Sequence, residues 1–233
     1  MQCAATASPF PDRLMLAEQA LAETQAVLAK ILPDFVIERL KADPEKPITD
    51  SFPDASVLFA DIVGFVGIAK RLGGNRTVGL LNDLIRQFDE LAARHGVEKI
   101  KTIGDGYMAV AGVPRPQVDH CKRLARLALD MQVAAARASE KMGMKIRLRI
   151  GIASGPVTAG VIGFNKFSYD VWGDTVNLAS RLEQLAGTDQ ILVSEQAMAK
   201  LGGDFQFSSR GTLQIRGLGT GQGWVLEGEG VLH

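Results

Sequence analysis

The chain has 233 residues, and its 46% hydrophobic content is enough for a sizeable core. Lysine plus arginine and aspartate plus glutamate both number 26, so no net basic field would attract nucleic acid or an anionic membrane. The two cysteines, Cys3 and Cys121, do not have the spacing of a disulfide framework or a zinc site. The sequence contains no apolar run near the roughly 20 residues of a membrane span and no secretion signal. These features predict a cytoplasmic protein, either free or as the cytosolic part of a membrane-anchored one.

The N-terminal part divides into a leader and a linker. Residues 1–11 contain two prolines with Ser and Thr and are expected to be disordered. Residues 12–53 are expected to be a helical, coiled-coil-like linker, in which Leu14, Leu21 and Leu28 recur every seven residues and predict a seam over 14–32. Pro33 interrupts this helix, and we expect a second helix over 34–41 and a loop over 42–53.

The main domain is expected to span residues 54–233. A β-rich run over 56–60 precedes an amphipathic helix over 75–94, which closes at Gly96. Strands over 97–103 and 107–113 are joined by Gly104-Asp105-Gly106, a tight hairpin signal.

The later elements complete the pattern of an α+β fold. A helix is expected over 120–136, strands over 145–152 and 157–162, a helix from Asp174 to about 185 with Asp174 as its N-cap, and a strand over 191–194. The glycines between 217 and 223 predict hairpin turns. The order β, α, β, β, α, β predicts a ferredoxin-like sandwich with additional C-terminal strands and a helix, preceded by the N-terminal helical segment.

Two aspartates at predicted strand ends are candidate metal ligands. Asp61 and Asp105 each follow an apolar strand and adjoin glycines, such as Gly64, that would let a phosphate approach backbone N–H groups. Either aspartate alone is most simply a cap or turn residue. The two together favour a paired site for divalent ions, with Mg²⁺ or Mn²⁺ as the natural choice for oxygen ligands.

Polar residues further along the chain add to this site. Asn177 and Arg181 are four positions apart and would project from one helix face, although an exposed helical arginine is normally only solvated surface. Lys101 lies on the strand that leads into the Asp105 turn, where an edge-strand lysine is the plain alternative. None of the histidines, His95, His120 and His233, indicates a catalytic triad.

Three segments together resemble the class III nucleotidyl cyclases, and most closely the bacterial adenylyl cyclases. They are Phe59-Ala60-Asp61-Ile62-Val63-Gly64-Phe65, the segment from Glu98 to Asp105, and the segment from Tyr169 to Arg181. The resemblance covers about Ser56 to Leu226 in family order and spacing, and the N-terminal helix is similar to the linker helices that precede such domains.

The resemblance implies a role for each site residue. Asp61, Asp105 and the backbone carbonyl of Ile62 would hold two Mg²⁺ or Mn²⁺ ions, and Gly64 and Phe65 would contact the substrate. Asn177 would orient the ribose, and Arg181 would stabilise the transition state at the α-phosphate. The resemblance also implies a head-to-tail homodimer with composite sites, while an upstream sensor or membrane domain is left open.

By the same resemblance, Lys101 and Asp170 would read the base. Adenine offers an acceptor at N1 and a donor at its 6-amino group, which suit a lysine and an aspartate, whereas guanine presents the reverse pattern. We therefore expect an adenylyl cyclase that uses ATP. A catalytically silent dimerisation or nucleotide-sensing module and a guanylyl cyclase are the alternatives. Many relatives carry a phosphate-binding lysine where this chain has Leu218, which leaves the residue that binds the terminal phosphates unassigned.

Overall fold

The computed structural model describes residues 10–163 and 166–230. The chain divides into two compact units, one formed by Met1–Ile48 and Val161–Tyr169 and the other by Thr49–Gly160 and Asp170–His233. The second unit therefore begins five residues before the predicted domain start, and a short internal segment groups with the N-terminal part.

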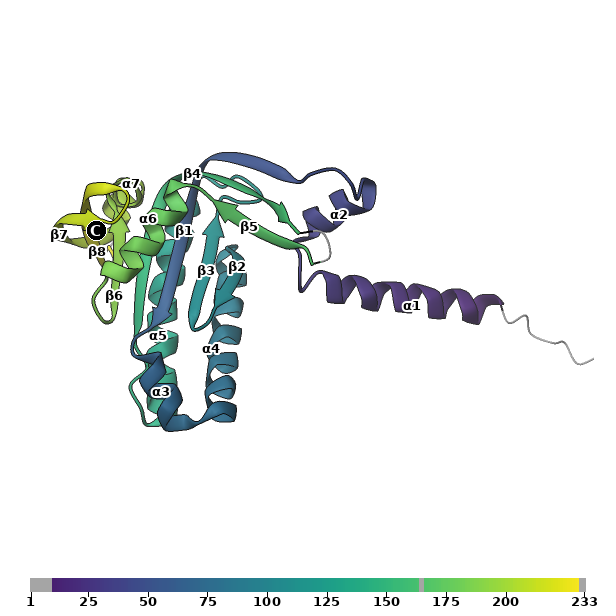
Figure 1. Cartoon of the computed structure of the whole chain (residues 1–233), viewed down its shortest axis with the longest axis horizontal. Coiled ribbons are helices and arrows are strands. Elements are labelled where there is room, and N and C mark those ends of the chain that lie inside the picture. The colour runs from purple at the N-terminus through teal and green to yellow at the C-terminus, as the bar shows by residue number, and fades with distance from the viewer. Residues whose placement is uncertain (1–9, 164–165, 231–233) are drawn as a thin grey trace, which may run out of the picture. The chain divides into compact units, whose positions relative to one another are not determined.

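The first unit contains two helices, α1 (Phe10–Leu28) and α2 (Asp34–Ala42) (Figure 1). Pro33 precedes α2, as its fixed φ and missing N–H favour. The predicted leader lies outside the described residues up to residue 9, and its last two residues belong to α1. The heptad leucines Leu14, Leu21 and Leu28 are all exposed, so the coiled-coil seam stays a prediction about a second chain.

The second unit is built on a βαββαβ core, which confirms the predicted ferredoxin-like class. The four core strands lie in the order β2-β3-β1-β4, and the sheet continues through β6 and β8 to β7, while β5 pairs with β4 (Figure 1). The strands are β1 (Thr49–Ile62), β2 (Glu98–Ile103), β3 (Gly106–Ala111), β4 (Leu148–Ile162), β5 (Ser168–Trp172), β6 (Gln190–Ser194), β7 (Phe205–Ile215) and β8 (Gly219–Glu229). The helices are α3 (Phe65–Leu72), α4 (Gly74–His95), α5 (His120–Met142), α6 (Asp174–Leu185) and α7 (Glu195–Leu201), and a 3₁₀ turn (Gly202–Asp204) follows.

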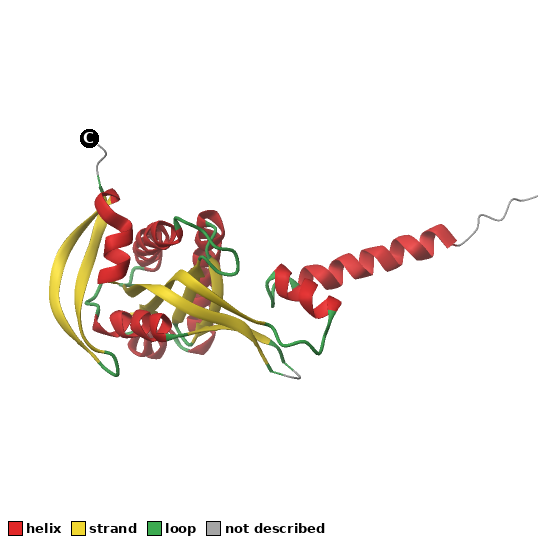
Figure 2. Ribbon diagram, turned by 90° about the horizontal axis from the view of Figure 1, so that it is seen from above, coloured by secondary structure: helices red, strands yellow, loops and turns green. Residues whose placement is uncertain are grey.

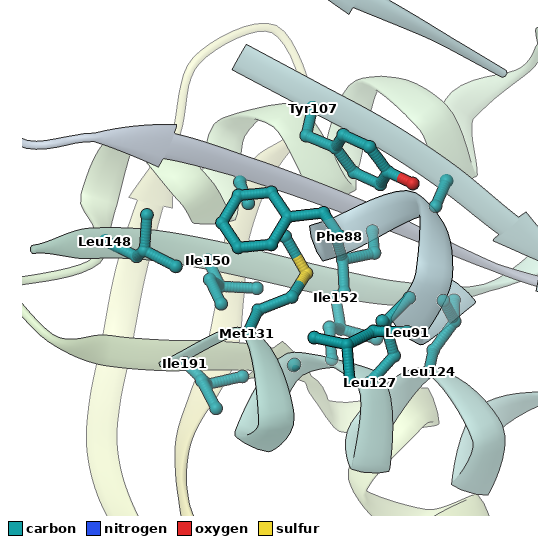
Figure 3. Packing of buried hydrophobic residues seen from close by; sticks show 14 of the residues in the cluster. Phe88, Leu91, Tyr107, Leu124, Leu127, Met131, Leu148, Ile150, Ile152 and Ile191 are labelled. Carbon is teal, nitrogen blue, oxygen red and sulfur yellow. The ribbon is translucent and has the colours of Figure 1, made fainter. Parts of the chain in front are cut away.

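Helices cover both faces of this sheet (Figure 2). On one face, side chains of α4 and α5 such as Phe88, Leu124 and Met131 pack against Ile150 and Ile152 of β4 (Figure 3). Gly151, between these two isoleucines, points to the opposite face because side chains alternate along a strand. On that face α6 packs against β1 and β6, so the sheet determines the position of this helix.

Several elements differ from the sequence-based prediction. The loop predicted over 42–53 is wrong from Thr49 onward, where β1 already runs, and the strands predicted over 145–152 and 157–162 form the single strand β4. The pairing of β1 with β4 shifts register between Phe52 and Ala55, opposite Pro156. A bulge tolerates prolines, which cannot donate to the ladder, so neither Pro53 nor Pro156 ends its strand.

Other boundaries follow the sequence more closely. The Gly104-Asp105-Gly106 hairpin is confirmed, with Ile103 paired to Gly106, and α4 lies where the apolar periodicity predicted it. The N-cap of α6 is Gly173, so the predicted Asp174 lies in the first helical turn instead. The turn between β7 and β8 contains Gly217 at φ 82°, and Gly219 at φ 84° begins β8, which confirms a hairpin there. The predicted turns at Gly221 and Gly223 are wrong, because both residues lie inside β8 and pair with β7. Over the described residues, no helix is both long enough and apolar enough to cross a lipid bilayer.

Candidate active site

The carboxyl groups of Asp61 and Asp105 lie side by side. Asp61 is the penultimate residue of β1, and the antiparallel pairing of Ala60 with Tyr107 brings the β2–β3 turn beside it. The Asp105 carboxyl is within hydrogen-bonding reach of that of Asp61. Burial and the neighbouring Asp61 raise the pKa of Asp105 to about 6, although contact with the backbone of Ile62 opposes this.

This pair is the acidic part of a site that needs further oxygen ligands. Among the residues that the structure describes, no group of three or more His, Cys, Asp or Glu side chains is arranged to hold a metal ion. A cation at Asp61 and Asp105 would therefore also use backbone oxygens, such as the carbonyl of Ile62, and oxygens of a bound substrate.

A guanidinium that the sequence analysis missed contacts Asp61. Arg149 lies directly opposite Asp61 in the register of β1 and β4, and its Nη2 is 2.5 Å from Asp61 Oδ2. The same nitrogen is 3.2 Å from Oε1 of Glu183 on α6. In the sequence, Arg149 is an outward-facing residue of an alternating strand and resembles any solvated arginine. Its pairing with Asp61, which the sequence does not show, is what distinguishes it.

Glu183 is the second missed residue. Its side chain is only 11% exposed, and burial raises its pKa to about 7 with help from Asp61 and Asp105, while Arg149 opposes the shift. Within the described structure, neither Glu183 Oε1 nor Arg149 Nε has a hydrogen-bond partner, although both atoms are buried. The ion pair between Arg149 Nη2 and Glu183 Oε1 is thus a charge contact without hydrogen-bond geometry. A glutamate inside the buried stripe of α6 was the available signal in the sequence.

Lys101 and Asp170 form an ion pair within one chain. Lys101 Nζ on β2 donates to Asp170 Oδ2 on β5 at 2.5 Å, and the backbone N–H of Val171 donates to Asp170 Oδ1 at 2.8 Å. The side chain of Asp170 is 17% exposed and that of Lys101 37%, so one edge of the pair faces solvent. The structure therefore brings together the two residues expected to read a base.

Asn177 and Arg181 lie on the outer face of α6. Asn177 is exposed, and Arg181 donates from Nη1 to Gln184 Oε1 at 2.9 Å. Glu183 follows Arg181 by two positions, about 200° around the helix, and faces the sheet. Among the described residues, no hydrogen bond or ion pair joins Asn177 or Arg181 to Asp61 or Asp105. One chain thus holds its aspartates and this helical pair as separate groups.

The position of α6 depends on a glycine beneath it. A Cβ on Gly151 would lie 2.2 Å from the backbone nitrogen of Glu183 and 2.3 Å from the carbonyl oxygen of Ala179. The helix backbone therefore rests directly on β4. This close approach brings Glu183 to Arg149, which lies two residues before Gly151 on the same face of the strand.

Gly64 and Phe65 connect β1 to a helix that the sequence analysis did not predict. Gly64 has φ 71°, a left-handed conformation that favours glycine, and it precedes α3, which starts at Phe65. No other group lies within 4 Å of the place where a Cβ on Gly64 would sit. The loop therefore leaves open backbone close to Asp61. With eight residues, about two turns, α3 was too short to predict from periodicity.

Leu218 lies in the β7–β8 turn and lines a cavity of about 400 Å³ together with Leu178, Leu182 and Ile215. Its apolar side chain thus belongs to a pocket beside α6. Arg216 in the same turn is exposed. The structure leaves the ligand of the terminal phosphates unassigned at this turn.

A Ser–His–Asp arrangement is present in the second unit but is closed to substrate. Ser56 Oγ is 2.7 Å from His120 Nδ1, and His120 Nε2 is 3.3 Å from Asp54 Oδ2. Ser56 has no exposed surface, and its hydroxyl also contacts that of Ser154 at 2.5 Å. A nucleophile needs access to its substrate, so this network joins β1, β4 and the start of α5 as a structural element.

Comparison with known proteins identifies the family. A model described as "Adenylate and Guanylate cyclase catalytic domain" matches residues 48–228. The chain belongs to this family of class III nucleotidyl cyclase catalytic domains.

Named relatives include both kinds of cyclase. An adenylate cyclase of Mycobacterium tuberculosis (strain ATCC 25618 / H37Rv) is 46% identical over 208 residues, which cover 89% of this chain and 47% of the relative. Guanylate cyclase soluble subunit beta-2 of Rattus norvegicus is 36% identical over 199 residues, which cover 84% of this chain and 29% of the relative. The chain thus spans about half or less of the length of these relatives.

Solved structures agree with the fold. The guanylate cyclase domain of RhGC from Catenaria anguillulae, in complex with GTP, is similar with a TM-score of 0.74 and 33% identity, and the match covers 77% of this chain and 99% of that one.

Proposed function

We propose that this domain is an adenylyl cyclase, which converts ATP to 3′,5′-cyclic AMP and pyrophosphate. The observation that carries the proposal is the pair of carboxyl groups of Asp61 and Asp105, held side by side at the end of β1. The Lys101–Asp170 pair and the 46% identity to a mycobacterial adenylate cyclase support the choice of ATP.

The residues present fit two Mg²⁺ or Mn²⁺ ions. Burial and the neighbouring Asp61 raise the pKa of Asp105, and a divalent cation would offset both the burial of charge and the repulsion between the two carboxylates. Asp61, Asp105 and the carbonyl of Ile62 supply the hard oxygen ligands that these ions prefer. When bound, such ions lower the pKa of the attacking ribose 3′-hydroxyl and neutralise triphosphate charge.

The other site residues of the chain bind and orient the nucleotide in this proposal. The first backbone N–H groups of a helix lack partners inside the helix and suit phosphate oxygens, so the start of α3 at Gly64 and Phe65 would contact the triphosphate. Asn177 would orient the ribose. Arg181 would meet the negative charge that develops at the α-phosphate in the transition state.

Base selection follows from the donors and acceptors of Lys101 and Asp170. Lysine has donors only and an ionised carboxylate has acceptors only, which matches N1 and the 6-amino group of adenine. Guanine would set a donor against the lysine and an acceptor against the aspartate. Each mispaired buried group costs about 1–3 kcal/mol, so ATP should be preferred by about tenfold or more.

The outward direction of Asn177 and Arg181 supports a composite site. Both project from the face of α6 that does not contact β1 and β6, and neither is joined to the aspartates by a described hydrogen bond or ion pair. A head-to-tail homodimer would supply this pair to the aspartates of the second chain. Each dimer would then contain two equivalent sites.

Conversion of GTP to cyclic GMP is the second candidate. Its support is the 36% identity to a rat guanylate cyclase subunit and the likeness to a cyclase domain in complex with GTP. The Lys101–Asp170 pair argues against it, for the reason given above.

The test is a side-by-side assay of the purified chain with Mn²⁺ and either ATP or GTP, over a range of protein concentrations. We expect cyclic AMP as the main product and a specific activity that rises with protein concentration. Asp61→Asn should abolish turnover, whereas the exposed Asp83→Asn on α4 should not. Absence of product from both nucleotides at every concentration would reject the proposal in favour of a silent module.

A further inference from the structure

We propose that Arg149 holds the cation position at Asp61 in the metal-free chain and is handed over to Glu183 when a divalent ion binds. Glu183 is thus a positioning residue for the metal site, although it is not a metal ligand. The inference rests on the proposed function, because it assigns the ion to Asp61.

Arg149 and a metal ion would compete for the carboxylate of Asp61. Arg149 Nη2 is 2.5 Å from Asp61 Oδ2, so the guanidinium occupies one of the two carboxylate oxygens that Asp61 offers to a cation. A side chain with a full positive charge at this distance also repels a second cation. In this proposal, an ion that binds at Asp61 displaces Arg149 by charge repulsion.

Glu183 offers the guanidinium of Arg149 a second acidic partner. Glu183 Oε1 is 3.2 Å from the same nitrogen and has no hydrogen-bond partner among the described residues, and neither has Arg149 Nε. Two buried, unsatisfied atoms of opposite charge type are unfavourable in this arrangement. A rotation of the guanidinium toward Glu183 would pair them in the planar, two-point geometry that arginine and carboxylate groups favour.

Few charged groups act on Arg149 in the described structure. Arg149 is 33% exposed and lies between β1 and α6, with Asp61, Asp105 and Glu183 as the charged groups that act on it. Asp61 and Asp105 are both taken by the ion in the bound state. Of the charged groups that act on Arg149 in the described part of the chain, Glu183 then remains to keep the guanidinium beside the site.

The test is direct measurement of Mn²⁺ binding to the full chain without nucleotide, by electron paramagnetic resonance of the free ion. Arg149→Ala removes the competing cation and should tighten binding by about fivefold, the equivalent of one ion pair. Glu183→Gln removes the destination and should weaken binding by a similar factor. Glu183→Asp keeps the charge but shortens the reach, so it should also weaken binding.

A double-mutant cycle separates handover from simple charge. If Glu183 acts through Arg149, Glu183→Gln should change Mn²⁺ affinity much less in the Arg149→Ala background than in the wild-type chain. An equal loss in both backgrounds, or wild-type affinity in Glu183→Asp, would show that only the charge of Glu183 matters and would overturn the proposal. Unchanged or weaker Mn²⁺ binding in Arg149→Ala would also overturn it.

A second measurement does not depend on affinity. The Nε–H resonance of Arg149, identified by its loss in Arg149→Lys, should move downfield when Mg²⁺ is added to the wild-type chain and should not move in Glu183→Gln. A resonance that ignores Mg²⁺ in the wild-type chain would overturn the handover. If the wild-type chain binds Mn²⁺ and makes cyclic nucleotide, but the variants do not show the expected changes in Mn²⁺ affinity, the handover is wrong and the proposed function still stands. If it binds no Mn²⁺ and has no turnover, the proposed function fails with it.

Discussion

Mixing two inactive variants gives the sharpest test of composite sites. Asp61→Ala removes a carboxylate of the proposed metal site, and Arg181→Ala removes the cation expected to stabilise the transition state. Loss of one such electrostatic contact typically lowers turnover on the order of a hundredfold or more. Each variant alone should therefore be inactive. The outward face of α6 that carries Arg181 predicts that each variant can complete the other.

The size of the rescue follows from the symmetry of a homodimer. Random mixing in equal amounts makes about half of the dimers mixed. In a mixed dimer, one site receives both substitutions and the other receives none. About half the dimers with one of two sites intact give about one quarter of the wild-type specific activity.

The assay is cyclic AMP production by the variants mixed, denatured and refolded together or co-expressed with two different tags. Recovery near one quarter of wild-type activity is the expected result. Two-step purification through both tags isolates the mixed dimers, which should reach about half of wild-type activity. Mixed dimers that form but stay as inactive as the single variants would refute the placement of Arg181 opposite the aspartates of the partner.

Four further predictions address other parts of the chain. Lys101→Glu combined with Asp170→Asn should move the preference between ATP and GTP toward GTP by about tenfold or more, measured as a ratio of kcat/KM values. The raised pKa of Asp105 means that an ion must displace a proton below about pH 6, so the Kd for Mn²⁺ should rise about tenfold per pH unit below that pH and level off above it. The same shift makes the metal-free fold lose stability as the pH rises from about 4 through 6, because the folded state holds this proton more tightly, and thermal unfolding should show this. Deleting residues 1–41 should raise the protein concentration needed for half-maximal activity, since Leu14, Leu21 and Leu28 are exposed on α1.

The elements that local chemistry determines could be predicted from the sequence. The turn at Gly104-Asp105-Gly106 requires the left-handed backbone seen at Gly104, with φ 63°, and strong apolar periodicity located α4. The start of β1 and the continuity of β4 could not be predicted, because both strands contain a proline. The sheet accommodates these prolines by a register shift that only the paired strands reveal.

The candidate site divides along the same line. Asp61 and Asp105 could be identified as candidate site residues because apolar residues and glycines surround them in the sequence. Arg149 and Glu183 do not, because their significance comes from contacts across 88 and 34 positions of sequence, given by the β1–β4 register and by the packing of α6 on β4. The strand and helix patterns of the sequence do not show which residues of different elements will be in contact.

The absence of a side chain at Gly151 lets the backbone of α6 lie directly on β4. A single methyl group there would meet the α6 backbone at two atoms and lift the helix from the sheet. Lifting the helix would shift Glu183 on its inner face together with Asn177 and Arg181 on its outer face. A glycine-to-alanine change at this position would therefore disturb both the contact with Arg149 and the proposed contacts with the nucleotide. A mutational survey should therefore find this chemically inert position among the least tolerant in the domain, with activity falling well before the protein ceases to fold.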